Sequence, residues 1–175
     1  MKHVVRSTVL AVLSVLLILL CTACGDKTPD YSKNEAYSHL FSEDDTADAV
    51  SLKNVILAHL EAYNAGDAEG YFSLFDMEKD DRAFNVMQFE ALRQTVDLTY
   101  TPEYVYTAFL NEDNAQALIT VTCKATDKTT GEVQFYYRTD LTYTMVRDGK
   151  WKITLNTPGA EEDLMYTLTT EEPES

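Results

Sequence analysis

The spacing of apolar residues divides the chain into three stretches with different patterns. Residues 9–20 are apolar apart from Ser14, and the chain turns polar soon afterwards. Between residues 46 and 95 apolar residues recur every three or four positions, which predicts helices, and from residue 96 they alternate with polar residues, which predicts strands. Helices followed by strands favour an α+β fold, in which the helices pack against a sheet.

The first helical stretch has one apolar face and a defined end. Gly66 stands where a left-handed C-terminal cap is expected, and Asp67 can cap a second short helix over residues 68–75. A third helix is predicted over about residues 82–95. The apolar face comprises Leu52, Val55, Ile56, His59, Leu60 and Tyr63 in the first helix, and Phe84, Met87, Ala91 and Leu92 in the third.

The second half of the chain predicts an antiparallel sheet. Period-two stretches cover residues 99–110, 115–127, 133–146 and 151–156, and the first is interrupted at Pro102. Short turns separate the stretches, and the Asp148-Gly149 pair before the last one is a hairpin signal. The residues expected on the inward face are Val133, Phe135, Tyr137, Thr139, Leu141, Tyr143 and Met145 of the third stretch, and Trp151, Ile153 and Leu155 of the last.

Two segments resemble the nuclear-transport-factor-2-like superfamily. AHLEAYNAGDAEGYFSLFD (residues 58–76) resembles its opening, where a long helix ends at Gly-Asp and a short helix follows, and RDGKWKITL (residues 147–155) is similar to its closing hairpin. The resemblance implies a cystatin-like cone, in which a curved antiparallel sheet wraps around the helices and leaves a pocket between them. Some members, such as ketosteroid isomerase and scytalone dehydratase, are enzymes, while many bacterial lipoproteins carry such domains without known activity. The fold therefore does not settle the function.

The N-terminus has the three-part build of a secretory signal. Basic residues Lys2 and Arg6 precede the apolar run, and small residues Thr22 and Ala23 precede Cys24. The run is too short for a typical membrane-spanning helix, which needs about 20 apolar residues. The end of the segment, CTAC, resembles the bacterial lipobox, which implies that Cys24 is lipidated and becomes the mature N-terminus. The alternatives are an uncleaved signal anchor and ordinary secretion.

These features predict four regions: a lipoprotein signal peptide (residues 1–23), a flexible tether (24–45), a nuclear-transport-factor-2-like domain (46–157) and an acidic C-terminal tail (158–175). Within the tether, residues 37–41 could dock on the domain. The expected location is the extracytoplasmic face of the cell membrane, with a lipid anchor.

The charge of the chain excludes one class of partner. The formal net charge is −15 at pH 7, and a surface this acidic does not suit the phosphates of nucleic acid. Cys123 lies on the apolar face of a predicted strand, which is typical of a buried thiol rather than a nucleophile. No cofactor and no metal site are expected.

The predicted interior offers little for catalysis. The inward faces of the strands hold no carboxylate, so no catalytic residue is assigned. His59 remains the alternative, because it lies on the apolar helix face and could point into the pocket. The candidate pocket lining comprises His59, Tyr63, Tyr137, Tyr143 and Trp151.

The first functional hypothesis is therefore a membrane-tethered, extracytoplasmic lipoprotein with a non-catalytic domain that binds a small ligand or an envelope protein. The second is a small-molecule lyase, isomerase or hydrolase that uses His59. Outward tyrosines such as Tyr106 and Tyr136 could also make the outer sheet face a homodimer interface.

Overall fold

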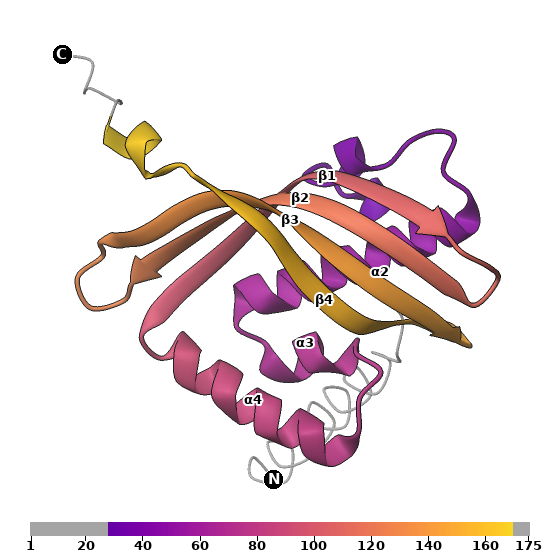
Figure 1. Cartoon of the computed structure of the whole chain (residues 1–175), viewed down its shortest axis with the longest axis horizontal. Helices are drawn as coiled ribbons and strands as arrows, with labels where there is room; N and C mark the ends of the chain where they lie inside the picture. Colours follow the sequence, from indigo (N-terminus) through magenta and orange to yellow (C-terminus); the bar gives the residue numbers. More distant parts are fainter. Residues whose placement is uncertain (1–27, 170–175) are drawn as a thin grey trace, which may run out of the picture.

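The computed structural model describes residues 28–169, and it shows helices packed against one face of a curved antiparallel sheet (Figure 1). The sheet contains four strands in the order β1-β2-β3-β4, each paired with its neighbour in sequence. The strands are β1 (Val96–Phe109), β2 (Asn114–Asp127), β3 (Val133–Asp148) and β4 (Lys150–Asp163). The helices are α2 (Ala47–Ala65), α3 (Ala68–Ser73) and α4 (Lys79–Arg93). The predicted α+β fold with a curved antiparallel sheet is confirmed.

The limits of α2 and α3 follow from local capping. The Oγ1 atom of Thr46 accepts a hydrogen bond from the Ala49 amide at 3.2 Å, which begins α2. Gly66 ends the helix at φ 70°, as predicted, because a residue without Cβ adopts this left-handed conformation without strain. Asp67 then caps α3 by accepting the Gly70 amide at 2.9 Å. Two caps on adjacent residues fold the chain back on itself, so α3 lies beside the end of α2.

The core lies between α2 and the concave face of the sheet. On α2, Leu52 and Ile56 are 0% exposed, and on the strands Ile119, Met145 and Ile153 are also 0% exposed. Burying a side chain of this size stabilises the fold by about 1.5–3 kcal/mol. The apolar face predicted for the first helix is thus the face that packs against the sheet.

The face predicted for α4 is wrong. Phe84, Met87 and Leu92 are largely exposed and Ala91 is exposed, whereas Phe89 is buried. The ring of Phe89 contacts Tyr63 of α2 at 5.1 Å between centroids. Because α4 carries few apolar residues, its orientation is set by this aromatic partner rather than by its own periodicity.

The inward face predicted for the strands is correct where the sheet lies over the helices, and it is wrong beyond the helices and after a bulge. Thr139, Leu141, Tyr143 and Met145 are buried as predicted, but Phe135 is 38% exposed because β3 extends beyond the helices. Leu155, predicted to point inward, is 56% exposed. A register shift between Thr144 and Met145 lets their partners on β4 be Leu155 and Ile153, so one extra residue turns Leu155 outward.

Side chains cover the outer edge of β1. The side chain of Asn64 pairs with both backbone groups of Tyr100: its Nδ2 donates to the carbonyl at 2.8 Å and its Oδ1 accepts the amide at 2.7 Å. The Nη1 atom of Arg93 donates to the Leu98 carbonyl at 2.7 Å. These bonds take the place of a neighbouring strand, which β1 lacks at this edge.

Residues 30–45, which we name the N-terminal strap, pack against α2. The backbone amide of Tyr31 donates to Asn54 Oδ1 at 2.9 Å, and Leu40 is buried in the core. Lys53 of α2 is buried and its Nζ donates to the Leu40 carbonyl at 3.0 Å and to Asp45 Oδ2 at 2.6 Å. A flexible tether was predicted for residues 24–45, whereas the strap is fixed to the domain at both its ends. The sequence of the strap shows no apolar periodicity, because the strap contacts the domain through a few separate residues rather than through one continuous face.

β4 extends further than predicted. Its last residues, Glu161 to Asp163, pair with Thr139 to Tyr137 of β3, so the segment predicted as a tail from residue 158 begins inside the sheet. At the other end, the free edge of β4 pairs with the loop after α3, where the Ile153 amide donates to the Leu74 carbonyl at 2.9 Å. Within residues 28–169, none of the helices combines the length and the apolar character needed to cross a membrane.

Candidate functional site

His59 occupies the centre of an aromatic cluster between α2, α3 and the sheet. It is 2% exposed, and its Nδ1 lies 3.0 Å from the hydroxyl of Tyr143. The imidazole stacks on the ring of Tyr71 with 4.1 Å between centroids, and Phe75 meets it edge-on. The helical spacing of the sequence aims His59 at the core, and the caps at Gly66 and Asp67 bring Tyr71 over it.

Burial sets the protonation state of this cluster. Desolvation lowers the pKa of His59 to about 3, so the imidazole is neutral at physiological pH. Burial also raises the pKa of Tyr143 well above its usual value, so the phenol keeps its proton. We assign the Tyr143 hydroxyl as the donor to Nδ1, which places the imidazole proton on Nε2. Among residues 28–169, this Nε2 has no hydrogen-bond partner.

A cavity of about 110 Å³ lies beside His59. Since a water molecule takes about 30 Å³ of liquid volume, the cavity has room for only a few waters or a small organic group. The side-chain oxygen of Asn156, a residue that lines this cavity, also has no hydrogen-bond partner within the described part of the chain. The lining residues are His59, Leu60, Tyr63, Tyr71, Tyr100, Leu141, Asn156 and Pro158, and no carboxylate is among them.

The residues predicted to line one pocket lie in three different places in the structure. His59 and Tyr63 line the small cavity, and Tyr143 holds His59. Tyr137 packs in a separate cluster with the buried Cys123, and Trp151 lines a different, larger groove. Sequence reasoning missed Tyr71, Tyr100, Asn156 and Pro158, because α3 and the bulges in the sheet decide where these residues point.

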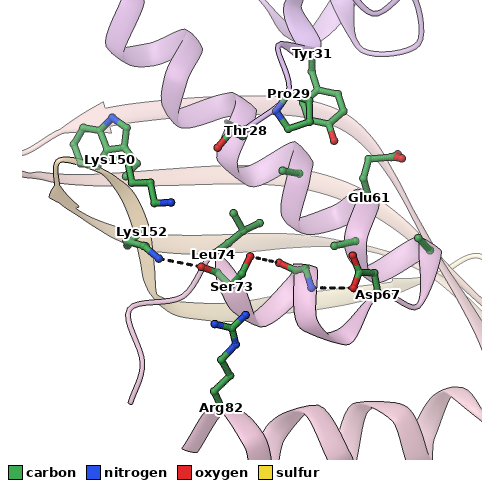
Figure 2. A pocket seen from close by; sticks show the side chains of 15 residues that line it. Thr28, Pro29, Tyr31, Glu61, Asp67, Ser73, Leu74, Arg82, Lys150 and Lys152 are labelled. Atoms are coloured by element: carbon green, nitrogen blue, oxygen red, sulfur yellow. Dashed lines mark hydrogen bonds between the residues drawn. The ribbon is translucent and has the colours of Figure 1, made fainter. Parts of the chain in front are cut away.

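The larger groove, of about 850 Å³, is shown in Figure 2. It lies on the opposite side of α2 from the small cavity, because the α2 residues that line the two belong to different faces of the helix. Its lining comes from five places in the sequence. These are Thr28, Pro29 and Tyr31 of the N-terminal region, Ala58, Glu61, Ala62 and Ala65 of α2, Asp67, Gly70, Ser73 and Leu74 in and around α3, Arg82 of α4, and Lys150, Trp151 and Lys152 at the start of β4. No periodic signal in the sequence identifies such a groove, because its walls meet only in the folded chain.

Charged side chains face each other across this groove. Figure 2 shows Lys150 and Lys152 on one side, Glu61 and Asp67 on the other, and Arg82 at the α4 end. Both acids accept internal hydrogen bonds, Glu61 from the Tyr37 hydroxyl and Asp67 from the Gly70 amide. Those bonds fix the positions of the two carboxylates at the groove wall.

Two of the cations that line the groove, Lys152 and Arg82, keep donor atoms for further contacts. The ammonium group of Lys152 donates to the Ser73 carbonyl at 2.9 Å, and an ammonium group has three donors. Arg82 donates from Nη2 to the Glu69 carbonyl at 2.9 Å and pairs with the Glu69 carboxylate at 3.2 Å, while its buried Nε has no partner among residues 28–169. The groove can therefore offer donors to an anionic group.

The described residues offer no centre for metal or thiol chemistry. In the range 28–169, no group of three or more His, Cys, Asp or Glu side chains is arranged to hold a metal ion. Cys123 is buried and free, and burial raises the pKa of its thiol. A protonated, inaccessible thiol is a poor nucleophile.

Several solved structures share this fold. A ketosteroid isomerase-like protein from Erwinia carotovora atroseptica matches with a TM-score of 0.53 and 14% identity over 65% of this chain and 96% of that chain. An uncharacterized protein with a cystatin-like fold from Caulobacter vibrioides matches with a TM-score of 0.54 and 15% identity over 71% and 96% of the two chains. A domain of unknown function with a cystatin-like fold from Nostoc punctiforme matches with a TM-score of 0.51 and 18% identity over 71% and 84%. Identities this low show the fold alone, which is the cystatin-like, nuclear-transport-factor-2-like fold.

In sequence, no curated protein matches the chain. Residues 54–171, which include most of α2, the helices after it and the whole sheet, match the family described as the C-terminal domain of the anti-sigma-I factor RsgI9. This match spans more than half of the chain, and the chain therefore belongs to that family.

Proposed function

We propose that the chain is a lipid-anchored, extracytoplasmic protein whose nuclear-transport-factor-2-like domain binds a ligand or a partner and does no chemistry on it. The observation that most directly supports the absence of catalysis is the state of His59. A general base or acid must change its protonation near the working pH and reach its substrate. His59 is neutral down to low pH, 2% exposed, and held by Tyr143 without a carboxylate partner within the described residues.

Binding is supported by the groove on the other side of α2. Its volume of about 850 Å³ lies within the range of about 300–1,000 Å³ that small-molecule sites span. The family name supports the same direction, because it describes part of a regulatory factor rather than an enzyme. The partner bound in the groove is a small ligand or an envelope protein. The outer sheet face, on which Tyr104 and Tyr106 are exposed, can serve as a homodimer surface.

The second candidate is a small-molecule lyase, isomerase or hydrolase that uses His59. The cavity of about 110 Å³ beside the imidazole favours it, since it contains an unpartnered donor at Nε2. The cavity lacks a carboxylate, and burial raises the pKa of its other titratable groups, the phenols of Tyr63, Tyr71 and Tyr100, so none of them is a ready base.

An NMR titration of the histidine ring nitrogens separates these two candidates. We expect the signals of His59 to stay unchanged from about pH 8 to 5, because its folded-state pKa lies near 3. The exposed His39 provides an internal comparison, and the His59→Gln variant assigns the signal. Titration of His59 close to neutral pH would favour the enzyme instead.

The anchor is tested by metabolic labelling with a fatty acid. We expect label on the parent protein and none on Cys24→Ala, because the thiol that carries the lipid is removed. Cys21→Ala is the matched control, since it removes a neighbouring thiol from the same segment, and it should keep the label. Label retained on Cys24→Ala, or absent from the parent, would disprove the assignment.

A further inference from the structure

The chain passes the rim of the groove immediately before and at the start of the N-terminal strap. Thr28 and Pro29 line the groove, and Tyr31 is bonded to Asn54 of α2. Further along the strap, Lys53 binds the carbonyl of Leu40, so the chain after Thr28 is attached to the domain rather than free. The segment that leads to the proposed anchor therefore leaves the domain at the groove and at no other face.

The chain between Cys24 and Thr28 is short. Four residue steps span at most about 14 Å even when fully extended, whatever their conformation. A flexible tether of the 22 residues first predicted would instead place the domain at a typical distance of about 25 Å with wide variation. Resting on the lipid anchor of the proposed function, this limit holds the rim of the groove near the lipid headgroups.

The groove has the charge that suits such a neighbour. Its lining carries three cations, Arg82, Lys150 and Lys152, against two carboxylates, Glu61 and Asp67 (Figure 2), whereas the chain as a whole carries a net charge of −15. Anionic headgroups attract basic residues within a Debye length and repel the acidic remainder of the domain. Attraction at the groove and repulsion elsewhere both favour an orientation in which the groove faces the membrane.

We propose that the groove faces the membrane and that Arg82, Lys150 and Lys152 bind the phosphate groups of anionic lipid headgroups. The docked strap holds the groove against the bilayer, and the cations fix its orientation. The end of β4, which lies far from α3 and α4 in Figure 1, then points away from the membrane.

Trp151 reports this orientation, because it is the only tryptophan of the chain and lies just under the groove, where it is 3% exposed and a quencher must act on it across the groove wall. The experiment uses the chain from Cys24 onward, which contains every residue of the described domain, coupled through the Cys24 thiol to a maleimide lipid in vesicles. Cys123 is buried and should not react, which a Cys24→Ser preparation checks. Chemical coupling makes this test independent of whether the cell lipidates Cys24.

Quenching of Trp151 emission by a headgroup nitroxide lipid is the readout. We expect quenching in vesicles of phosphatidylcholine with phosphatidylglycerol, and a partial loss of quenching in Lys150→Gln. The matched control Lys124→Gln removes the same charge from the outer sheet face and should quench like the parent. A ten-residue Gly-Ser insertion after Gly25 should also reduce the quenching, because it lengthens the tether.

Two results would overturn the proposal. Absence of quenching in the parent would mean that the groove faces away from the bilayer and is open to a protein partner. Equal quenching in Lys150→Gln, Lys124→Gln and the parent would mean that the cations make no contact with headgroups. Failure of fatty-acid labelling in cells would disprove the natural anchor alone, so the two proposals fail separately.

Discussion

The ion pair between Lys53 and Asp45 joins the strap to α2, and its two halves should respond differently to substitution. The side chain of Lys53 is 6% exposed and that of Asp45 is 13% exposed, with 2.6 Å between Nζ and Oδ2. Asp45→Asn leaves a buried ammonium group with only neutral partners, one of them the Leu40 carbonyl at 3.0 Å. Removing one partner of a buried pair costs about 3–5 kcal/mol, and we expect about 3 kcal/mol here because an amide oxygen remains.

Lys53→Met should cost less, about 1 kcal/mol, because the methionine fills the same space without a charge. The remaining carboxylate of Asp45 lies closer to solvent and still accepts the Ser42 amide at 2.9 Å. In the Lys53→Met background, Asp45→Asn should therefore have little further effect. Coupling of this size is expected only for residues in direct contact.

Urea unfolding of the parent, the two single variants and the double variant measures these differences. Hydrogen exchange of the Phe41 amide, which bonds to the Ser38 carbonyl at 3.1 Å, shows whether the strap detaches before the domain unfolds. If Lys53→Met cost as much as Asp45→Asn, or if the two effects simply added, the reasoning about a desolvated ammonium group would be refuted.

Three further predictions concern α2 and its surroundings. Asn64→Leu should destabilise the domain by about 2 kcal/mol, because it removes both bonds to the Tyr100 backbone; an unchanged thermal melt would contradict this role. Gly66→Val should cost about 1–2 kcal/mol by forcing a β-branched residue to φ 70°, whereas a melt like that of the parent would mean that the cap relaxes. Burial lowers the pKa of His59 to about 3 in the folded state, so the unfolded state binds the proton first as the pH falls. The parent should therefore lose about 2 kcal/mol more than His59→Gln between pH 7 and 5, as measured by urea unfolding, and equal losses would refute the burial argument.

The fold was predictable where each element carries its own signal. The face of α2 that includes Leu52 and Ile56 could be predicted from periodicity, and Gly66 with Asp67 marked the turn between two helices. Leu155 was assigned to the wrong face, because a bulge shifts the alternation by one residue and leaves no trace in the apolar pattern. Phe89 was missed for a different reason: a helix with few apolar residues takes its orientation from its neighbours.

The sites were less predictable than the fold. Helical spacing placed His59 in the interior, but its partner Tyr143 and the stacked Tyr71 meet it only because of the tertiary fold. The groove joins Thr28 to Lys150 across most of the sequence, and such separations leave no local pattern. Buried Lys53 shows the same limit, because a lysine is ordinarily expected at the surface.

The acidic end of β4 has a consequence for crowded conditions. β4 is an outer strand of the sheet, and beyond Ile153 its free edge continues through Glu161, Glu162 and Asp163. An exposed edge is a template to which another copy could add a strand. Such an addition would set carboxylates directly opposite carboxylates, which is unfavourable while they are ionised. Lipid anchoring would concentrate copies in two dimensions, and this acidic edge would then keep neighbouring sheets from joining into filaments.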